Sequence, residues 1–188
     1  MYALVTDGSI TKTLSGNRGI TIGGVQYPQN IFTLWSAAEK EAIGIYEVVW
    51  DNTNKKDEAY YNNTDVSYTF GNGKVTASYG SATALALADV TNEDDSISPG
   101  LKTQHKEIIK RQASSLLTIY DWYVIRKADA GTAVPSAITT YRAAVRTKSG
   151  EMETLIDACS TVDELAALYV YNNADPRVRP LGEFPEAV

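Results

Sequence analysis

The stretch RQASSLLTIYDWYVIRKADAGTAVPSAITTYRAAVRT, from Arg111 to Thr147, determines the fold class expected for the second half of this chain. In and before it, apolar residues recur at the spacing of one helix face. They are Ile108, Ile109, Ala113, Leu116, Leu117, Tyr120 and Val124. The periodicity predicts one helix from Leu101 to about Lys127.

Two helix-breaking residues, Gly131 and Pro135, follow that helix. Because a proline disfavours helical geometry in the residue before it, the chain should turn here. The next periodic segment predicts a second helix over Ser136–Lys148, ended by Ser149-Gly150 and followed by a short element over Met152–Ala158. Ser160-Thr161 then offers a further N-cap.

The first half has strand signals instead. Asp7-Gly8 and Gly23-Gly24 separate alternating apolar residues, and each pair predicts a hairpin turn. Ser36 followed by Glu39 predicts a capping box at the start of a short helix. Segments rich in valine, tyrosine, threonine and phenylalanine predict further strands over residues 45–50, 58–61, 66–70 and 74–79.

These patterns predict an α+β protein, in which a small antiparallel β-rich N-terminal domain precedes an α-helical C-terminal domain. We expect the β-rich domain, with one short helix, over residues 1–90, and an acidic linker over 91–100. The helical domain should occupy 101–172. Residues 173–188 hold three prolines and should form an extended tail, either packed on a neighbouring subunit or lying loosely on its own domain.

The composition excludes several classes of function. The formal charge of −6 argues against binding to nucleic acid, because phosphate contacts need a basic surface. The basic cluster of Lys102, Lys106, Lys110 and Arg111 is too small to change that balance. A single cysteine, Cys159, allows no intrachain disulfide and no cysteine-based metal site. No apolar run is long enough to cross a bilayer, so we expect a soluble protein.

Catalytic motifs are absent from the sequence. The single histidine, His105, lies between Gln104 and Lys106, away from any glycine-framed nucleophile. No phosphate-binding loop, dinucleotide turn or zinc-protease motif occurs. The acidic run Glu93-Asp94-Asp95 lacks the spacing of a calcium loop. We therefore expect no enzymatic activity, no cofactor and no metal.

The aromatic side chains of the first half allow two interpretations. They could stack on sugar rings in a carbohydrate-binding module, or they could fill cross-strand pairs and the core, which we favour. The residues are Tyr46, Trp50, Tyr60, Tyr61, Tyr68, Phe70 and Tyr79.

Residues 104–148 resemble the C-terminal region of bacteriophage tail-fibre assembly proteins. In that family an Asp-Trp element, a proline turn and a helix with the pattern Y-R-x-x-[LV]-R recur in this order. They correspond here to Asp121-Trp122, Pro135 and Tyr141–Arg146. The partner-binding candidates are Trp122, Tyr123, Arg126, Tyr141, Arg142 and Arg146. The alternative, which we favour for Trp122, is that Trp122 and Tyr141 pack the helix against its neighbour. Asp121 would then accept a hydrogen bond from Arg142 or Arg146 and so fix the turn.

The resemblance implies a protein that binds a tail-fibre polypeptide, or another tail protein, and assists its folding or attachment. A homo-oligomer would also fit. We expect it in the host cytoplasm during assembly. The alternative is a permanent virion component, such as a tail-fibre cap, adaptor or decoration subunit. A carbohydrate-binding module is the third interpretation.

Overall fold

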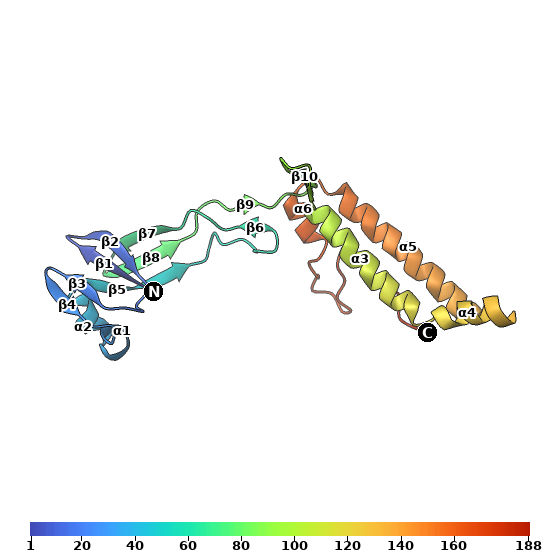
Figure 1. Ribbon diagram of the computed structural model, residues 1–188, viewed down its shortest axis with the longest axis horizontal. Coiled ribbons are helices and arrows are strands. Elements are labelled where there is room, and N and C mark those ends of the chain that lie inside the picture. Colours follow the sequence, from blue (N-terminus) through green and yellow to red (C-terminus); the bar gives the residue numbers. More distant parts are fainter. The chain divides into compact units, whose positions relative to one another are not determined.

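The computed structural model describes all 188 residues, and the chain folds as an α+β protein with two compact units (Figure 1). The first unit, Met1–Thr83, is rich in strands, and the second, Ala84–Val188, is helical. The division therefore falls before the acidic segment 91–100. That segment contains the strand β11 (Ile97–Ser98), which pairs with β10 (Val90–Thr91).

A five-stranded sheet forms the body of the first unit. Its order is β2 (Ser9–Leu14), β1 (Tyr2–Thr6), β5 (Ile45–Asp51), β8 (Lys74–Ser78) and β7 (Ser67–Gly71). Three pairs are antiparallel, but β5 and β8 run parallel. The parallel pair arises because the β7–β8 hairpin joins the sheet through its second strand. This is a departure from the antiparallel sheet that the sequence indicated.

Five further short elements complete the first unit. They are β3 (Ile20–Ile22), β4 (Val25–Tyr27), α1 (Ile31–Leu34), α2 (Ala37–Glu41) and β6 (Tyr61–Asn62). The predicted hairpins and the capping box are confirmed, the latter by reciprocal bonds between Ser36 and Glu39. The strand predicted at residues 58–61 is a turn up to Tyr60. There the carbonyl of Asp57 accepts hydrogen bonds from the Tyr60 and Tyr61 N–H groups.

The two-residue strand β9 (Thr83–Ala84) spans the division between the units. Four helices follow in the second unit: α3 (Leu101–Thr118), α4 (Asp121–Ala130), α5 (Ser136–Ala158) and α6 (Val162–Ala167). The predicted N-cap of the last helix is confirmed, since Thr161 and Glu164 form a capping box.

The helix boundaries correct two predictions. The helix predicted from Leu101 to Lys127 is broken at Tyr120, and α5 continues through Ser149-Gly150 without interruption. A glycine inside a helix costs only about 1 kcal/mol relative to alanine. In α5 the buried side chains of Val145 and Met152 lie on either side of that glycine, and their packing outweighs the cost.

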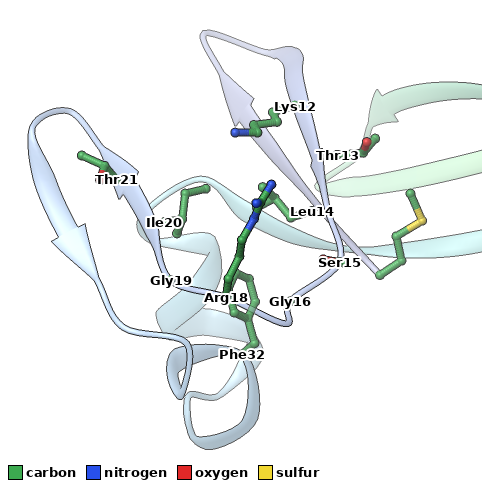
Figure 2. Close-up of a pocket in the computed structure, with 11 residues that line it drawn as sticks. Lys12, Thr13, Leu14, Ser15, Gly16, Arg18, Gly19, Ile20, Thr21 and Phe32 are labelled. Carbon is green, nitrogen blue, oxygen red and sulfur yellow. The ribbon is translucent and has the colours of Figure 1, made fainter.

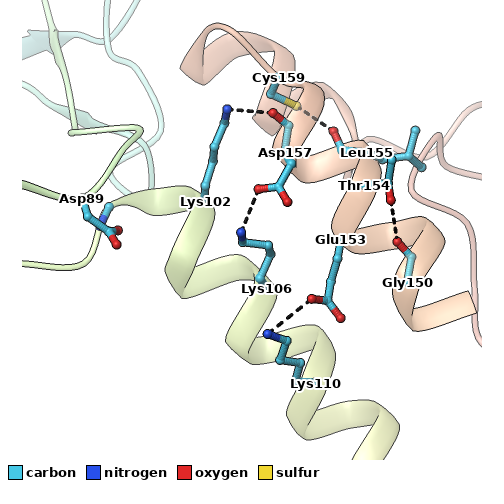
Figure 3. A network of polar contacts seen from close by, with 11 residues as sticks. Asp89, Lys102, Lys106, Lys110, Gly150, Glu153, Thr154, Leu155, Asp157 and Cys159 are labelled. Carbon is cyan, nitrogen blue, oxygen red and sulfur yellow. Dashed lines mark hydrogen bonds and ion pairs between the residues drawn. The ribbon is translucent and has the colours of Figure 1, made fainter. Parts of the chain in front are cut away.

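Three lysines of α3 form polar contacts with α5 (Figure 3). Lys102 donates to the Asp157 carbonyl at 2.9 Å, Lys106 pairs with the Asp157 carboxylate at 2.7 Å, and Lys110 pairs with Glu153 at 3.3 Å. The Asp157 carboxylate raises the pKa of Lys106 through this hydrogen bond. The spacing of four residues places the three lysines on one face of α3. Most of the basic cluster seen in the sequence is therefore paired within the fold.

The C-terminal tail packs on its own unit. Leu181 is fully buried, and its N–H donates to the carbonyl of Leu168. Phe184 packs against the core that contains Tyr120 and Tyr141. The tail thus lies on its own domain, and it is packed there and not loose, because Leu181 belongs to the core.

Candidate interaction surface on helix α4

Tyr120 marks the corner between α3 and α4. Its backbone leaves helical geometry, with φ −109° and ψ 8°, while its side chain is buried. The ring packs edge-to-face on Tyr141 with 5.3 Å between centroids, and its hydroxyl donates to the Val188 carbonyl. The aromatic side chain is thus anchored in the core, and the chain turns around it. Beyond this corner, α4 extends from the end of the α3–α5 pair (Figure 1).

Arg142 of α5 fixes this corner from the other side. Its Nη1 donates to the Leu117 carbonyl at 2.6 Å and forms an ion pair with Asp121 Oδ1 at 2.8 Å. Leu117 lies in the last turn of α3, where its carbonyl also accepts a hydrogen bond from the Tyr120 N–H, and Asp121 begins α4. A cation at a helix C-terminus and an anion at a helix N-terminus are both favourable. The Arg142 side chain is 11% exposed, so it acts here as a structural residue.

The first turn of α4 carries a stack of two aromatic rings and one cation. The centroids of Trp122 and Tyr123 lie 3.8 Å apart. The Arg126 guanidinium lies 4.8 Å from the Trp122 centroid and 5.4 Å from that of Tyr123. The Arg126 Nε is buried and lacks a hydrogen-bond partner. Cation–π contacts of this kind are attractive and help to hold the long Arg126 side chain against the two rings.

Helix α4 buries none of its residues completely. Trp122 is 50% exposed and Ile125 is 66% exposed. Residues three apart are neighbours on a helix surface, so these two side chains form one apolar patch. Ile119, in the corner before α4, and Val124 are exposed as well. Large apolar side chains grouped in this way mark an interaction surface more often than scattered single ones do. We call Ile119, Trp122, Ile125 and Arg126 the α4 surface.

The structure separates the six candidate residues into two groups. Trp122, Tyr123 and Arg126 lie together on α4, as described. Tyr141 lies in the core, where burial raises the pKa of its hydroxyl, which has no hydrogen-bond partner. Arg146 is exposed on α5, with 3.4 Å between its Nη1 and the Arg142 carbonyl, and it lines a groove of about 490 Å³.

Three expectations about individual side chains are wrong. Trp122 does not pack between helices, and Ile108 and Val124 are exposed and not part of a buried helix face. Arg142 contacts Asp121 as expected, in an ion pair with 2.8 Å between Nη1 and Oδ1. Ile119 and Ile125 were not singled out in the sequence. The sequence feature that points to them is their spacing: Ile119 lies three residues before Trp122 and Ile125 three residues after it. Both lie outside the helix face that continues from α3.

Three of the seven aromatic side chains singled out in the first half pack against its core, and two more stack on each other. Tyr46, Tyr68 and Phe70 pack against buried sheet residues, and Tyr46 and Phe70 stack with 4.8 Å between centroids. Trp50 and Tyr79 stack on each other at 5.2 Å. These contacts are cross-strand packing, as the favoured interpretation expected.

Titratable and nucleophilic groups lie in structural positions. The His105 ring is half-buried, and its Nδ1 lies 2.7 Å from the Tyr169 hydroxyl. Burial lowers the pKa of His105. Cys159 is buried, which raises the pKa of its thiol. No three histidine, cysteine, aspartate or glutamate side chains converge where a metal ion could bind. None of the helices combines the length and apolarity that a membrane span requires.

Comparison with known proteins adds no relative: no family model, curated protein or solved structure matches this chain.

Proposed function

We propose that this protein binds another polypeptide through the α4 surface, and that its partner is a bacteriophage tail-fibre polypeptide whose folding or attachment it assists. The observation that carries the proposal is the exposure of Trp122 and Ile125 on a helix with no fully buried residue. Tryptophan and arginine are enriched among the residues that contribute most to protein–protein binding.

The tail-fibre partner is supported by the resemblance of residues 104–148. Within that motif, Tyr141 and Arg142 hold the corner at Tyr120 together, whereas Trp122 is presented to solvent. The motif thus combines a structural part and an exposed part. Physically, such a helper would cover apolar surface or unpaired strand edges of an immature fibre until the trimer closes.

The test is co-expression of this chain with the tail-fibre protein of its source phage. Ile125→Lys should reduce the yield of soluble fibre trimer towards the yield obtained without this chain. Val170→Lys is the matched control, because Val170 is 65% exposed in the same unit and lies outside the α4 surface. Equal yields with the two variants would refute a role for α4 in this activity.

Counting the copies of this chain in virions distinguishes the proposed assembly protein from the alternative, a permanent virion component. Quantitative mass spectrometry of purified virions would compare copies of this chain with a known tail protein. A transient assembly protein should be absent from virions and present in infected lysate. A stoichiometric count in virions would instead make it a cap, adaptor or decoration subunit.

A further inference from the structure

A second candidate site lies in the first unit, whereas the α4 surface belongs to the second unit. There a cavity of about 910 Å³ opens between β2, the loop after it and β3 (Figure 2). Leu14, Ile20 and the buried ring of Phe32 give it an apolar floor. Pockets of about 300–1,000 Å³ are of the size that hold a ligand.

The strands beside this cavity are edge strands. β2 is the last strand of the five-stranded sheet, and β3 pairs only with β4. β3 therefore has one side without a strand neighbour. β2 has a hydrogen-bonded neighbour on one side only, but β7 lies close to it. An edge of this kind pairs readily with an extended segment of another chain, whose main chain then supplies the hydrogen bonds.

The charge of the cavity is positive although the chain as a whole carries −6. Lys12 of β2 and Arg18 of the following loop both line it, and no acidic side chain does. In Figure 2 their side chains extend into the same space above Phe32. Neither cation takes part in a salt bridge. The lysines of α3, in contrast, are paired with Asp157 and Glu153.

We infer that this cavity binds an extended, acidic segment of another polypeptide, which lies between β2 and β3 with its carboxylates against Lys12 and Arg18. The β3 edge provides main-chain pairing, the apolar floor takes alternate side chains, and the two cations select acidic residues. The inference does not depend on the α4 surface, since all its residues belong to Met1–Thr83.

The test is an NMR titration of the full chain, observed through its backbone amides. The probe is an eight-residue peptide that alternates glutamate with valine and is blocked at both ends. A second peptide has lysine in place of glutamate, and inorganic phosphate is the third probe. We expect the acidic peptide to produce saturable shifts of amides within residues 12–21, and the lysine peptide to produce none.

Charge reversal by Lys12→Glu with Arg18→Glu should weaken binding of the acidic peptide at least tenfold. Lys74→Glu is the matched control, because Lys74 is an exposed strand lysine outside the cavity. This variant should bind the acidic peptide as tightly as the unmodified chain does. If the double variant does not give the dispersed spectrum of a folded chain, Arg18→Gln serves in its place, with a smaller loss of affinity.

Three results would overturn the inference. The first is an acidic peptide that gives no saturable shifts at millimolar concentration. The second is a set of shifts caused by phosphate and not by the peptide, which would indicate a site for small anions. The third is unchanged peptide affinity after the charges at Lys12 and Arg18 are reversed.

Discussion

Arg142 in α5 reaches Asp121 at the start of α4, with 2.8 Å between Arg142 Nη1 and Asp121 Oδ1. The same nitrogen donates to the Leu117 carbonyl, so one guanidinium joins α5 to the end of α3 and the beginning of α4. The orientation of α4, and with it the position of Trp122, depends on this contact.

We therefore expect Arg142→Ala to lower the free energy of unfolding by about 2–3 kcal/mol, since hydrogen bonds to charged groups contribute about 1.5–3 kcal/mol. Asp121→Asn should cost about 1 kcal/mol or less, because Asp121 is about half exposed. Urea unfolding of both single variants and the double variant measures the coupling. Strictly additive losses would show that the pair does not act as a unit.

Trp122→Ala should change stability by no more than about 0.5 kcal/mol, as expected for an exposed side chain. Its effect should appear in partner binding, where loss of a central aromatic residue costs about 2 kcal/mol or more. Tyr141→Ala should show the opposite pattern, because Tyr141 is buried in the core. Removing a buried aromatic side chain of this size costs about 3–5 kcal/mol of stability. Thermal unfolding and a fibre-binding assay, made on both variants, separate the two roles.

Gly100 and Gly150 should respond in opposite directions to the same substitution. A Cβ at Gly100 would lie 2.3 Å from the backbone of Ala88, so Gly100→Ala should destabilise the second unit by about 1–3 kcal/mol. A Cβ at Gly150 would meet nothing within 4 Å, and Gly150 lies inside α5. Gly150→Ala should therefore stabilise by about 0.5–1 kcal/mol. Guanidinium unfolding of both variants provides the comparison, and a loss at Gly150 would contradict the continuous α5.

His105 should make stability depend on pH just below neutrality. Burial lowers its pKa in the folded chain, so the unfolded chain binds the proton first as the pH falls below about 6.5. The free energy of unfolding should then decrease from pH 7.5 towards the folded pKa. The Tyr169 hydroxyl faces the His105 ring, and the Arg179 guanidinium lies over the Tyr169 ring.

His105→Gln should flatten the stability profile between pH 7.5 and 5.5. Carboxyl groups with lowered pKa, such as Glu39 and Asp89, lose their stabilising bonds only below about pH 5, so they leave this window unaffected. Denaturant unfolding at several pH values, with the two chains in parallel, makes the measurement. An identical slope in both chains would show that another group is responsible.

Local signals in the sequence were sufficient for the elements whose partners lie close along the chain. The hairpin turns at Asp7-Gly8 and Gly23-Gly24 and the capping boxes at Ser36 and Thr161 are of this kind. Each depends on bonds within a few residues or between adjacent strands. The α+β class followed from the same patterns, because strand and helix periodicities are local properties.

Only the tertiary structure determined which long-range partner each segment found. The parallel pairing of β5 with β8 depends on how a complete hairpin joins the sheet, and the break at Tyr120 depends on Tyr141 and Arg142 of another helix. The local sequence pattern could not predict which aromatic side chains are buried either. Trp122 and Tyr141 are both aromatic residues on helices, yet one is exposed and the other is in the core, because packing between helices and not periodicity within one decides which face is covered.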